Sequence, residues 1–237
     1  MSITEGIILC GGKGTRITSV TKNNIPKPLI KINGKSILEW QLELLGKFGI
    51  DHVVLATGHL ADKISKKLGY SMKVGDMKIE LSYSYEKEKL GSGGGIKQAS
   101  SQISSSDIII LNGDILTNAD ITPLLQIHSN MKFDITMLLA NMISPFGVAK
   151  LENQLIVDFL EKPKLDVPIH AGIDIVNTKI IKRFPDKGQM EDTIFVDIVK
   201  ERKMGYFLMS DSTYWRSIDT EKDYLSAKND WQPIRSP

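Results

Sequence analysis

A glycine-rich, basic segment, Gly11–Arg16, directly follows the apolar run Ile7–Cys10 near the start of the chain. Such a run predicts a buried parallel strand that delivers the loop after it to one edge of a sheet. Glycines let backbone N–H groups approach an anion closely, and Arg16 adds positive charge there. The spacing matches neither the P-loop nor the dinucleotide fingerprint, because Ile17 stands where the latter needs its third glycine. The segment predicts a phosphate-binding loop, with a ligand-free glycine turn as the alternative.

Four further segments that could carry chemistry follow in order. Two prolines flank Lys27 and stiffen its backbone. Leu90–Gly95 is a second glycine-rich turn that opens a helix. Asn112-Gly113-Asp114 follows an apolar strand, at the sheet edge where ligands bind in open α/β folds. Glu161-Lys162-Pro163 comes fourth, with Ala171-Gly172 and Tyr214–Thr220 downstream.

Two of these segments also have simple structural interpretations. Asp114 could cap the following turn. Glu161 and Lys162 could form an ordinary solvated ion pair, which is the common explanation for adjacent opposite charges. Their occurrence together with Pro163 and Gly172 favours a functional role.

Strand-like and helix-like segments alternate along the first half of the chain. The predicted strands are Ile7–Cys10, His52–Thr57, Lys78–Tyr83, Asp107–Leu111, Asp134–Ala140, Gly147–Leu151, Gln154–Phe159, Ile173–Asn177 and Tyr206–Met209. The predicted helices are Ser36–Phe48, Leu60–Leu68, Gly95–Ile103, Ile121–Ser129 and Thr193–Lys203. This alternation predicts an α/β fold with a mostly parallel central sheet covered by helices on both faces.

The pattern changes after about residue 131, where the strands come closer together. Gly147–Leu151 and Gln154–Phe159 predict a hairpin that turns at Glu152-Asn153. We interpret this region as a small antiparallel extension folding over the first half, because no flexible linker precedes it. The expected organisation is one catalytic domain over residues 1–230 and a loosely held tail over 231–237, which contains two prolines.

Composition limits the classes of function. The 237 residues carry 30 basic and 28 acidic side chains, a net charge of +2, with the basic residues spread along the chain. Binding to nucleic acid or to a membrane surface is not expected without a clustered basic field. The single cysteine, Cys10, excludes an internal disulfide and a cysteine-based zinc cluster, and is expected to be a small buried hydrophobe. With neither a signal peptide nor a membrane-length apolar run, a cytoplasmic protein is expected.

Taken in this order, the motifs resemble those of the sugar-1-phosphate nucleotidyltransferases, or nucleotide-sugar pyrophosphorylases. The resemblance extends from Gly6 to about Tyr224 and is most specific at Gly11–Arg16, Pro26-Lys27-Pro28, Asn112-Gly113-Asp114 and Glu161-Lys162-Pro163. It implies a single Rossmann-like three-layer α/β/α domain of the nucleotide-diphospho-sugar transferase fold. It also implies transfer of a nucleoside monophosphate from a nucleoside triphosphate to a sugar 1-phosphate, with release of pyrophosphate.

The resemblance also implies a role for each matching residue. The nucleotide would contact Leu9, Gly11, Gly12, Gly14, Thr15, Arg16, Gly93, Gly94, Asn112 and Gly113. Arg16, Lys27, Asp114 and Lys162 would be catalytic. The sugar phosphate would contact Gly147, Glu161, Lys162, His170 and Gly172, and Mg²⁺ would bind Asp114 and Asp219.

Three departures from the family pattern bear on these roles. Ser217 stands where most members carry the second metal-binding aspartate, and the carboxylate is shifted by two residues to Asp219. Asp219 could still reach the metal, because alternate residues of an extended segment share a face. Thr220-x-x-Asp223 also predicts a capping box, so Asp219 could instead belong to a helix start. His170 replaces a frequent asparagine, and Glu86–Lys89 lacks the glutamine by which uridylyl and thymidylyl enzymes read the base.

The absence of that glutamine, with the Leu-Gly-x-Gly-Gly form of the second turn, favours guanylyltransferases acting on mannose- or heptose-1-phosphate. The alternatives are a cytidylyl-, thymidylyl- or uridylyltransferase and, from another class, a non-catalytic regulatory subunit that binds nucleotide sugars. Retention of Arg16, Lys27, Asp114 and Lys162 argues against the regulatory subunit. No C-terminal β-helix domain is expected, and a homodimer through the catalytic domain stays open.

Overall fold

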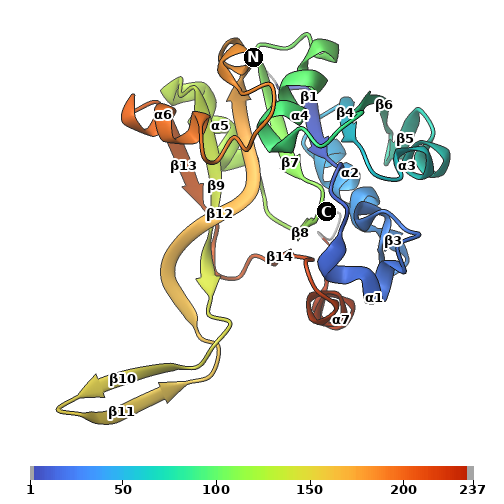
Figure 1. The fold of residues 1–237 in the computed structure, drawn as a ribbon. Coiled ribbons are helices and arrows are strands. Elements are labelled where there is room, and N and C mark those ends of the chain that lie inside the picture. The colour runs from blue at the N-terminus through green and yellow to red at the C-terminus, as the bar shows by residue number, and fades with distance from the viewer. Residues whose placement is uncertain (1–2, 234–237) are drawn as a thin grey trace.

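A twisted eight-stranded sheet forms the centre of this computed structural model, which describes residues 3–233 (Figure 1). Its strand order is β13-β9-β12-β7-β1-β4-β6-β5. The strands are β1 (Glu5–Leu9), β4 (His52–Thr57), β5 (Ser71–Val74), β6 (Met77–Tyr85), β7 (Asp107–Asn112), β9 (Ile135–Ile143), β12 (Lys164–Asn177) and β13 (Met204–Leu208). β1 pairs in parallel with β4 and β7, and β4 with β6, while β12 runs antiparallel to both its neighbours. The mostly parallel sheet predicted from the alternating pattern is confirmed.

Helices cover both faces of this sheet. The helices are α1 (Thr18–Thr21), α2 (Ile37–Lys47), α3 (Ala61–Leu68), α4 (Gly91–Ala99), α5 (Thr122–Met131), α6 (Ile194–Lys200) and α7 (Glu221–Asp230). In β1, Ile8 packs in one apolar cluster with residues of α2, α3 and α5, whereas Ile7 packs in a second cluster with residues of α4 and α6. Consecutive strand residues point to opposite faces, so these two isoleucines separate the layers of a three-layer fold.

Local capping explains where two of the helices begin. Ser36 accepts a hydrogen bond from the Glu39 backbone N–H, and the Glu39 carboxylate accepts one from Ser36 in return. Thr220 and Asp223 form the same reciprocal arrangement at the start of α7. These boxes satisfy backbone donors that a helix start leaves unpaired, and the box at Thr220 was predicted from the sequence.

Short strands outside the central sheet complete the fold. β2 (Lys31–Ile32) pairs with β3 (Lys35–Ser36), and β8 (Ile115–Thr117) pairs antiparallel with β14 (Trp215–Ser217). β10 (Val148–Glu152) and β11 (Leu155–Leu160) form a hairpin. It turns at Asn153-Gln154, which both have positive φ, one residue later than expected.

Two expectations about the second half of the chain are wrong. The antiparallel extension does not fold over the first half: β9 and β12 join the central sheet, and the β10–β11 hairpin projects away from it (Figure 1). Trp231 does not belong to a loose tail, because it is buried against Trp40 and Tyr214 and closes a small apolar cluster. Residues 234–237 of the predicted tail lie outside the described residues.

Candidate active site

The glycine-rich loop and the Asn112–Asp114 turn meet at the carboxyl edge of the parallel strands. β1 and β7 are neighbours in the sheet, and the Gly113 N–H donates a 3.0 Å hydrogen bond to the Leu9 carbonyl. A Cβ on Gly113 would lie 2.4 Å from that carbonyl oxygen, so this approach requires glycine. The chain thereby fixes the distance between the glycine-rich loop and Asp114.

Lys27 joins two carboxylates that are far apart in the sequence. Its Nζ donates hydrogen bonds to Asp114 Oδ2 at 2.6 Å and to Asp219 Oδ1 at 2.7 Å. The lysine side chain is 11% exposed and comes from a short 3₁₀ helix, Lys27–Leu29, that starts after Pro26. A buried ammonium between two carboxylates is a charge-assisted arrangement that holds all three groups in place.

The β8–β14 pairing brings Asp219 to this lysine. Ser217 lies opposite Ile115, directly after Asp114, and the Ile218 N–H donates to the Asp114 carbonyl. The Asp219 carboxylate also accepts hydrogen bonds from Ser217 Oγ and from Arg16 Nη2, each at 2.8 Å. The carboxylate that caps α7 is that of Asp223, so the Asp219 carboxylate faces Lys27 and Arg16.

The charges around Asp219 set its protonation. Burial disfavours the ionised carboxyl, but Lys27, Ser217 and Arg16 together outweigh burial and lower the pKa of Asp219 below its usual value. Arg16 itself is largely exposed. The guanidinium therefore stays accessible to an anionic ligand while it contacts Asp219.

Two clefts lie side by side at this edge. The first, about 240 Å³, is lined by Leu9, Cys10, Gly12, Gly14, Thr15, Arg16, Lys27, Pro28, Gly113, Asp114 and Asp219. The second, about 170 Å³, is lined by Leu9, Gly11, Gly12, Glu86, Lys89, Gly91, Ser92 and Gln189. Leu9 and Gly12 line both clefts, so the clefts are neighbours. An extended ligand could run from one cleft into the other across the glycine loop.

The second glycine-rich segment opens a helix, as expected, but Gly93 and Gly94 do not face the clefts. Its glycines form the first turn of α4. A Cβ on Gly94 would lie 2.4 Å from the Asp186 carbonyl oxygen, and one on Gly93 would lie 2.8 Å from Pro185. Gly93 and Gly94 are buried against that segment and line neither cleft; within the turn, Gly91 and Ser92 line the second cleft.

The residues expected to bind the sugar phosphate are only partly brought to this edge. Gly172 lies there: a Cβ on it would be 3.0 Å from Asn112 Nδ2. Lys162 Nζ pairs with Glu161 Oε1 at 2.6 Å, and neither residue lines the two clefts. Gly147 lies against the ring of Phe159, at the root of the hairpin.

His170 faces a different neighbourhood. Its Nε2 is 2.9 Å from Asp174 Oδ2, and its ring packs edge-on against Phe195 of α6. Burial disfavours the charged imidazole, but the Asp174 carboxylate outweighs burial and raises the pKa of His170. Its place in sugar binding stays a prediction.

Gln41 is a site residue that the sequence did not indicate. It lies on α2, is buried, and its Nε2 donates to the carbonyl oxygens of Asn112 at 2.8 Å and Ile115 at 2.9 Å. These two bonds clamp the turn that carries Asp114. The only sequence signal was a polar residue within the apolar stretch of a predicted helix, which is uninformative alone.

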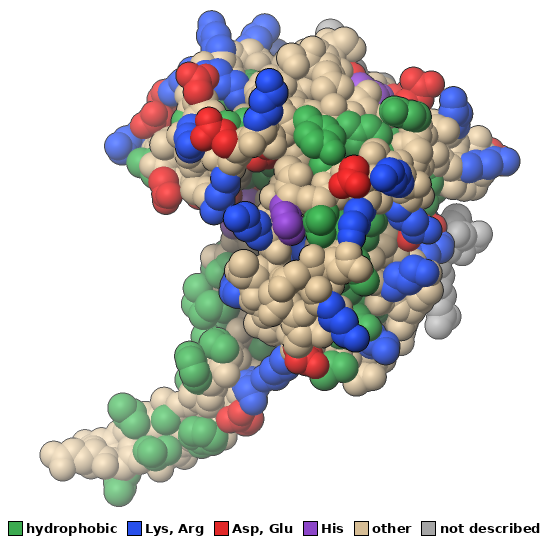
Figure 2. Space-filling model, turned by 45° about the vertical axis from the view of Figure 1, so that its right-hand side comes forward, with side chains coloured by type: hydrophobic (Ala, Val, Ile, Leu, Met, Phe, Trp, Pro, Cys, Tyr) green, Lys and Arg blue, Asp and Glu red, His purple; other side chains and the backbone are tan. Residues whose placement is uncertain are grey.

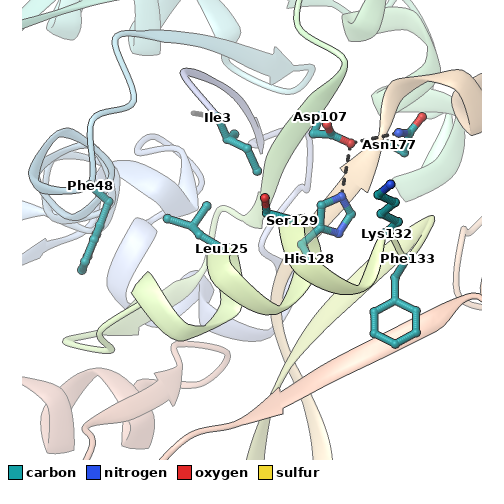
Figure 3. A pocket seen from close by; sticks show the side chains of 9 residues that line it. All are labelled: Ile3, Phe48, Asp107, Leu125, His128, Ser129, Lys132, Phe133 and Asn177. Atoms are coloured by element: carbon teal, nitrogen blue, oxygen red, sulfur yellow. Dashed lines mark hydrogen bonds and ion pairs between the residues drawn. The ribbon is translucent and has the colours of Figure 1, made fainter. Parts of the chain in front are cut away.

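A further cavity, about 430 Å³ and larger than either cleft, lies at the opposite edge of the sheet, where β7 begins (Figure 3). His128 Nε2 and Asn177 Nδ2 both contact Asp107 Oδ1 there, at 3.2 and 3.0 Å. Four of the lining residues are apolar: Ile3, Phe48, Leu125 and Phe133. Neither the glycine loop nor the Lys27–Asp114–Asp219 cluster lines this cavity, so the two smaller clefts are the better candidates for the active site.

Comparisons with known proteins agree with this arrangement. The family model for nucleotidyl transferases matches residues 5–233. The chain belongs to this family. It is 30% identical over 234 residues to the mannose-1-phosphate guanylyltransferase of Mycobacterium tuberculosis, covering 95% of this chain and 64% of that protein. It is 31% identical to the D-glycero-α-D-manno-heptose 1-phosphate guanylyltransferase of Aneurinibacillus thermoaerophilus, covering 96% and 98%.

Solved structures of the family share the fold. The crystal structure of HddC from Yersinia pseudotuberculosis complexed with GMP-PN superimposes with a TM-score of 0.71 at 27% identity, over 96% of this chain and 99% of that one. A UDP-glucose pyrophosphorylase complexed with UDP-glucose, 17% identical, shares the fold with a TM-score of 0.74. The chain spans less than two thirds of the M. tuberculosis relative but nearly all of the heptose 1-phosphate enzyme. Within residues 3–233, each helix is too short or too polar to cross a membrane.

Proposed function

We propose that this chain transfers a nucleoside monophosphate from a nucleoside triphosphate to a sugar 1-phosphate, with GTP as the nucleotide and mannose- or heptose-1-phosphate as acceptor. The observation that carries the proposal is the cluster of Lys27, Asp114, Asp219 and Arg16 beneath the glycine loop. The names of the guanylyltransferase relatives and the GMP-PN complex of HddC support the same reaction and the same base.

The reaction suits a site without a general base. A sugar-phosphate oxygen attacks the α-phosphorus, the bond from that phosphorus to the bridging oxygen breaks, and pyrophosphate leaves with the bond's electron pair. A phosphate monoester has a second pKa of about 6, so the nucleophile is already largely a dianion at neutral pH. The barrier is the repulsion between anions, which positioned cations lower. Lys27 and Arg16 supply those charges, and Thr15 with the glycine-loop N–H groups would orient the phosphates.

The two aspartates fit a divalent cation. The carboxylates of Asp114 and Asp219 both accept hydrogen bonds from the Lys27 ammonium, so they lie close together. Carboxylate and phosphate oxygens are the ligands that Mg²⁺ prefers. Residues 3–233 hold no group of three or more His, Cys, Asp or Glu side chains arranged for a metal, so substrate phosphates and water would complete the coordination. When bound, Mg²⁺ would neutralise phosphate charge.

Glu86 supports the assignment of guanine. It lines the second cleft, and its carboxylate lies between Gly11 and Gly95, where a Cβ would come within 3.0 and 2.8 Å of Oε1. A carboxylate only accepts hydrogen bonds, and guanine presents two adjacent donors, N1–H and the N2 amino group. On their pairing edges, adenine and cytosine place an acceptor beside their donor, and uracil and thymine flank one donor with acceptors. Burial raises the pKa of Glu86, and hydrogen bonds donated by a bound guanine would counteract this shift by stabilising the carboxylate.

The experiment is pyrophosphate release with Mg²⁺, with GTP, CTP, dTTP, UTP and ATP each paired with mannose-, glucose- and heptose-1-phosphate. We expect turnover with GTP and one of the mannose-type acceptors. Turnover with another nucleotide would overturn the assignment of the base alone. Nucleotide binding in a thermal-shift assay without turnover on any pair would favour the regulatory-subunit alternative.

A further inference from the structure

The β10–β11 hairpin and its flanks form an apolar arm, residues 143–168, that leaves the body of the molecule (Figure 1). Within residues 3–233, β10 and β11 pair with each other and with no other strand. Every residue of both strands is exposed. The two hairpin strands therefore obtain no stability from burial in the core of their own chain.

Large apolar side chains are concentrated on this arm, and Figure 2 shows them along the projection behind its tip. It carries ten of the eighteen exposed large hydrophobic residues in the described part of the chain. They are Ile143, Phe146, Val148, Leu151, Leu155, Ile156, Val157, Phe159, Leu160 and Val167. Contiguous exposed apolar patches of this kind mark interaction sites, whereas scattered apolar residues do not.

Both faces of the ribbon are apolar. Ile156 and Val157 are consecutive, as are Phe159 and Leu160, and consecutive strand residues point to opposite faces. A strand that lies with one face in water alternates apolar and polar residues instead. A two-stranded hairpin is also only marginally stable alone in water, and a further apolar layer is needed to hold it. The arm therefore needs a further apolar surface that covers it.

We propose that the arm is a self-association surface, covered by the same arm of a second copy of this chain. Size supports this: a stable interface takes about 20–30 residues per partner, and residues 143–168 provide that number. Charge supports it too. Lys150 lies opposite Asp158 in the hairpin register, and Lys162 and Lys164 are paired with Glu161 and Asp211.

An arm with balanced charges and two apolar faces has no field to attract nucleic acid or an anionic membrane, and its best match is an equally neutral apolar ribbon. A two-fold axis places identical patches against each other, so the arm's own surface meets that condition. Two arms together provide four strands, which reaches the number that can be stable in water. Association would also fix the root of the arm, which carries Glu161 and Lys162.

Sedimentation velocity over a range of protein concentrations tests the proposal without reference to activity, so its failure would leave the proposed function untouched. The arm variant is the double substitution Leu151→Lys and Ile156→Lys, at cross-strand neighbours that are 73% and 66% exposed. The matched control is Tyr206→Lys with Leu225→Lys, two exposed apolar residues of the body with the same change of charge.

We expect the wild type and the control to self-associate at micromolar concentrations. The arm variant should be monomeric, with a dissociation constant raised at least about a hundredfold. Its circular dichroism should match the wild type, because the substituted side chains are exposed. A wild-type protein that stays monomeric at tens of micromolar, or an arm variant that associates like the wild type, would overturn the proposal.

Discussion

The Lys27 ammonium donates a 2.7 Å hydrogen bond to the Asp219 carboxylate, although 192 residues separate them. The same ammonium contacts Asp114, so residues 27, 114 and 219, from three distant parts of the chain, meet at one nitrogen. The three-residue strand pair β8–β14 makes this meeting possible. Any substitution that loosens that pair should weaken the site without touching its charged groups.

Asp114→Asn should lower turnover by at least about a thousandfold while leaving the fold intact, because an amide keeps the shape but loses the charge that would hold Mg²⁺. Pyrophosphate release and the melting temperature are the measurements. Asp120→Asn is the control, since Asp120 only accepts a bond from the Thr122 backbone N–H. A rate near that of the wild type would contradict the metal role.

Asp219→Asn should be nearly as damaging as Asp114→Asn, since Asp219 is the second carboxylate on Lys27. Ser217→Ala should cost less than about tenfold, because Ser217 Oγ only orients Asp219. The two kcat values, measured at saturating Mg²⁺, provide the comparison. If the ranking is reversed, Asp219 serves the start of α7 instead of the metal.

Lys162→Ala should raise KM for the sugar phosphate more than KM for the nucleotide, since Lys162 is expected to grip the sugar phosphate. Lys164→Ala is the matched control, because Lys164 Nζ pairs with Asp211 at 2.8 Å. Initial rates with each substrate varied in turn distinguish the two effects. The opposite ranking of the KM values would mean that the two phosphate sites are exchanged.

Glu86→Gln should reduce kcat/KM for GTP by about 10–100-fold, because the amide presents one donor to a base edge that itself donates twice. ITP lacks the N2 amino group, so the wild type should prefer GTP to ITP and the variant should lose most of that preference. Glu88→Gln is the control, since Glu88 is a surface residue paired with Lys187. An unchanged GTP/ITP ratio would exclude Glu86 from base recognition.

Glu5→Gln should make stability less dependent on acid pH. Burial alone would raise the pKa of Glu5, but hydrogen bonds from Ser105, His52 and Ser104 lower it to about 2. A depressed pKa stabilises the fold above the unfolded value of 4.5, and this contribution disappears as pH falls from 4.5 towards 2. Urea unfolding at pH 7 should show the variant to be less stable by up to about 3 kcal/mol. The difference should shrink at pH 3, and a constant difference would contradict this account.

The long elements of the fold could be predicted because their signals are local. Apolar runs such as Val53–Ala56 and caps such as the Thr220–Asp223 box depend on residues a few positions apart. The β8–β14 pair could not be predicted in the same way, since three residues are too few for a periodicity. Gln41 was missed because its role depends on two carbonyls of a turn more than 70 residues away.

The hairpin shows a different limit. Gly147–Leu151 and Gln154–Phe159 were correctly predicted to pair as a hairpin, but the absence of a flexible linker was taken to mean that they fold over the first half of the chain. Periodicity tells which residues avoid water, and says nothing about whether the covering surface belongs to the same chain. Similarly, the resemblance predicted catalytic roles for Arg16, Lys27 and Asp114, which the structure brings together around Asp219. Gly93 and Gly94 also follow the family pattern, yet they pack against Pro185–Gly188.

The single cysteine, Cys10, lies at the wall of the first cleft, beside Lys27 and Asp114, and is 1% exposed. Burial, with smaller contributions from Asp114 and Glu86, raises the pKa of the Cys10 thiol, so it stays protonated and shielded. Alkylating reagents and mild oxidants should therefore leave the native protein unmodified. A cysteine introduced anywhere on the surface would then be the one reactive thiol of the chain, available for a fluorophore or a spin label without first removing a native residue.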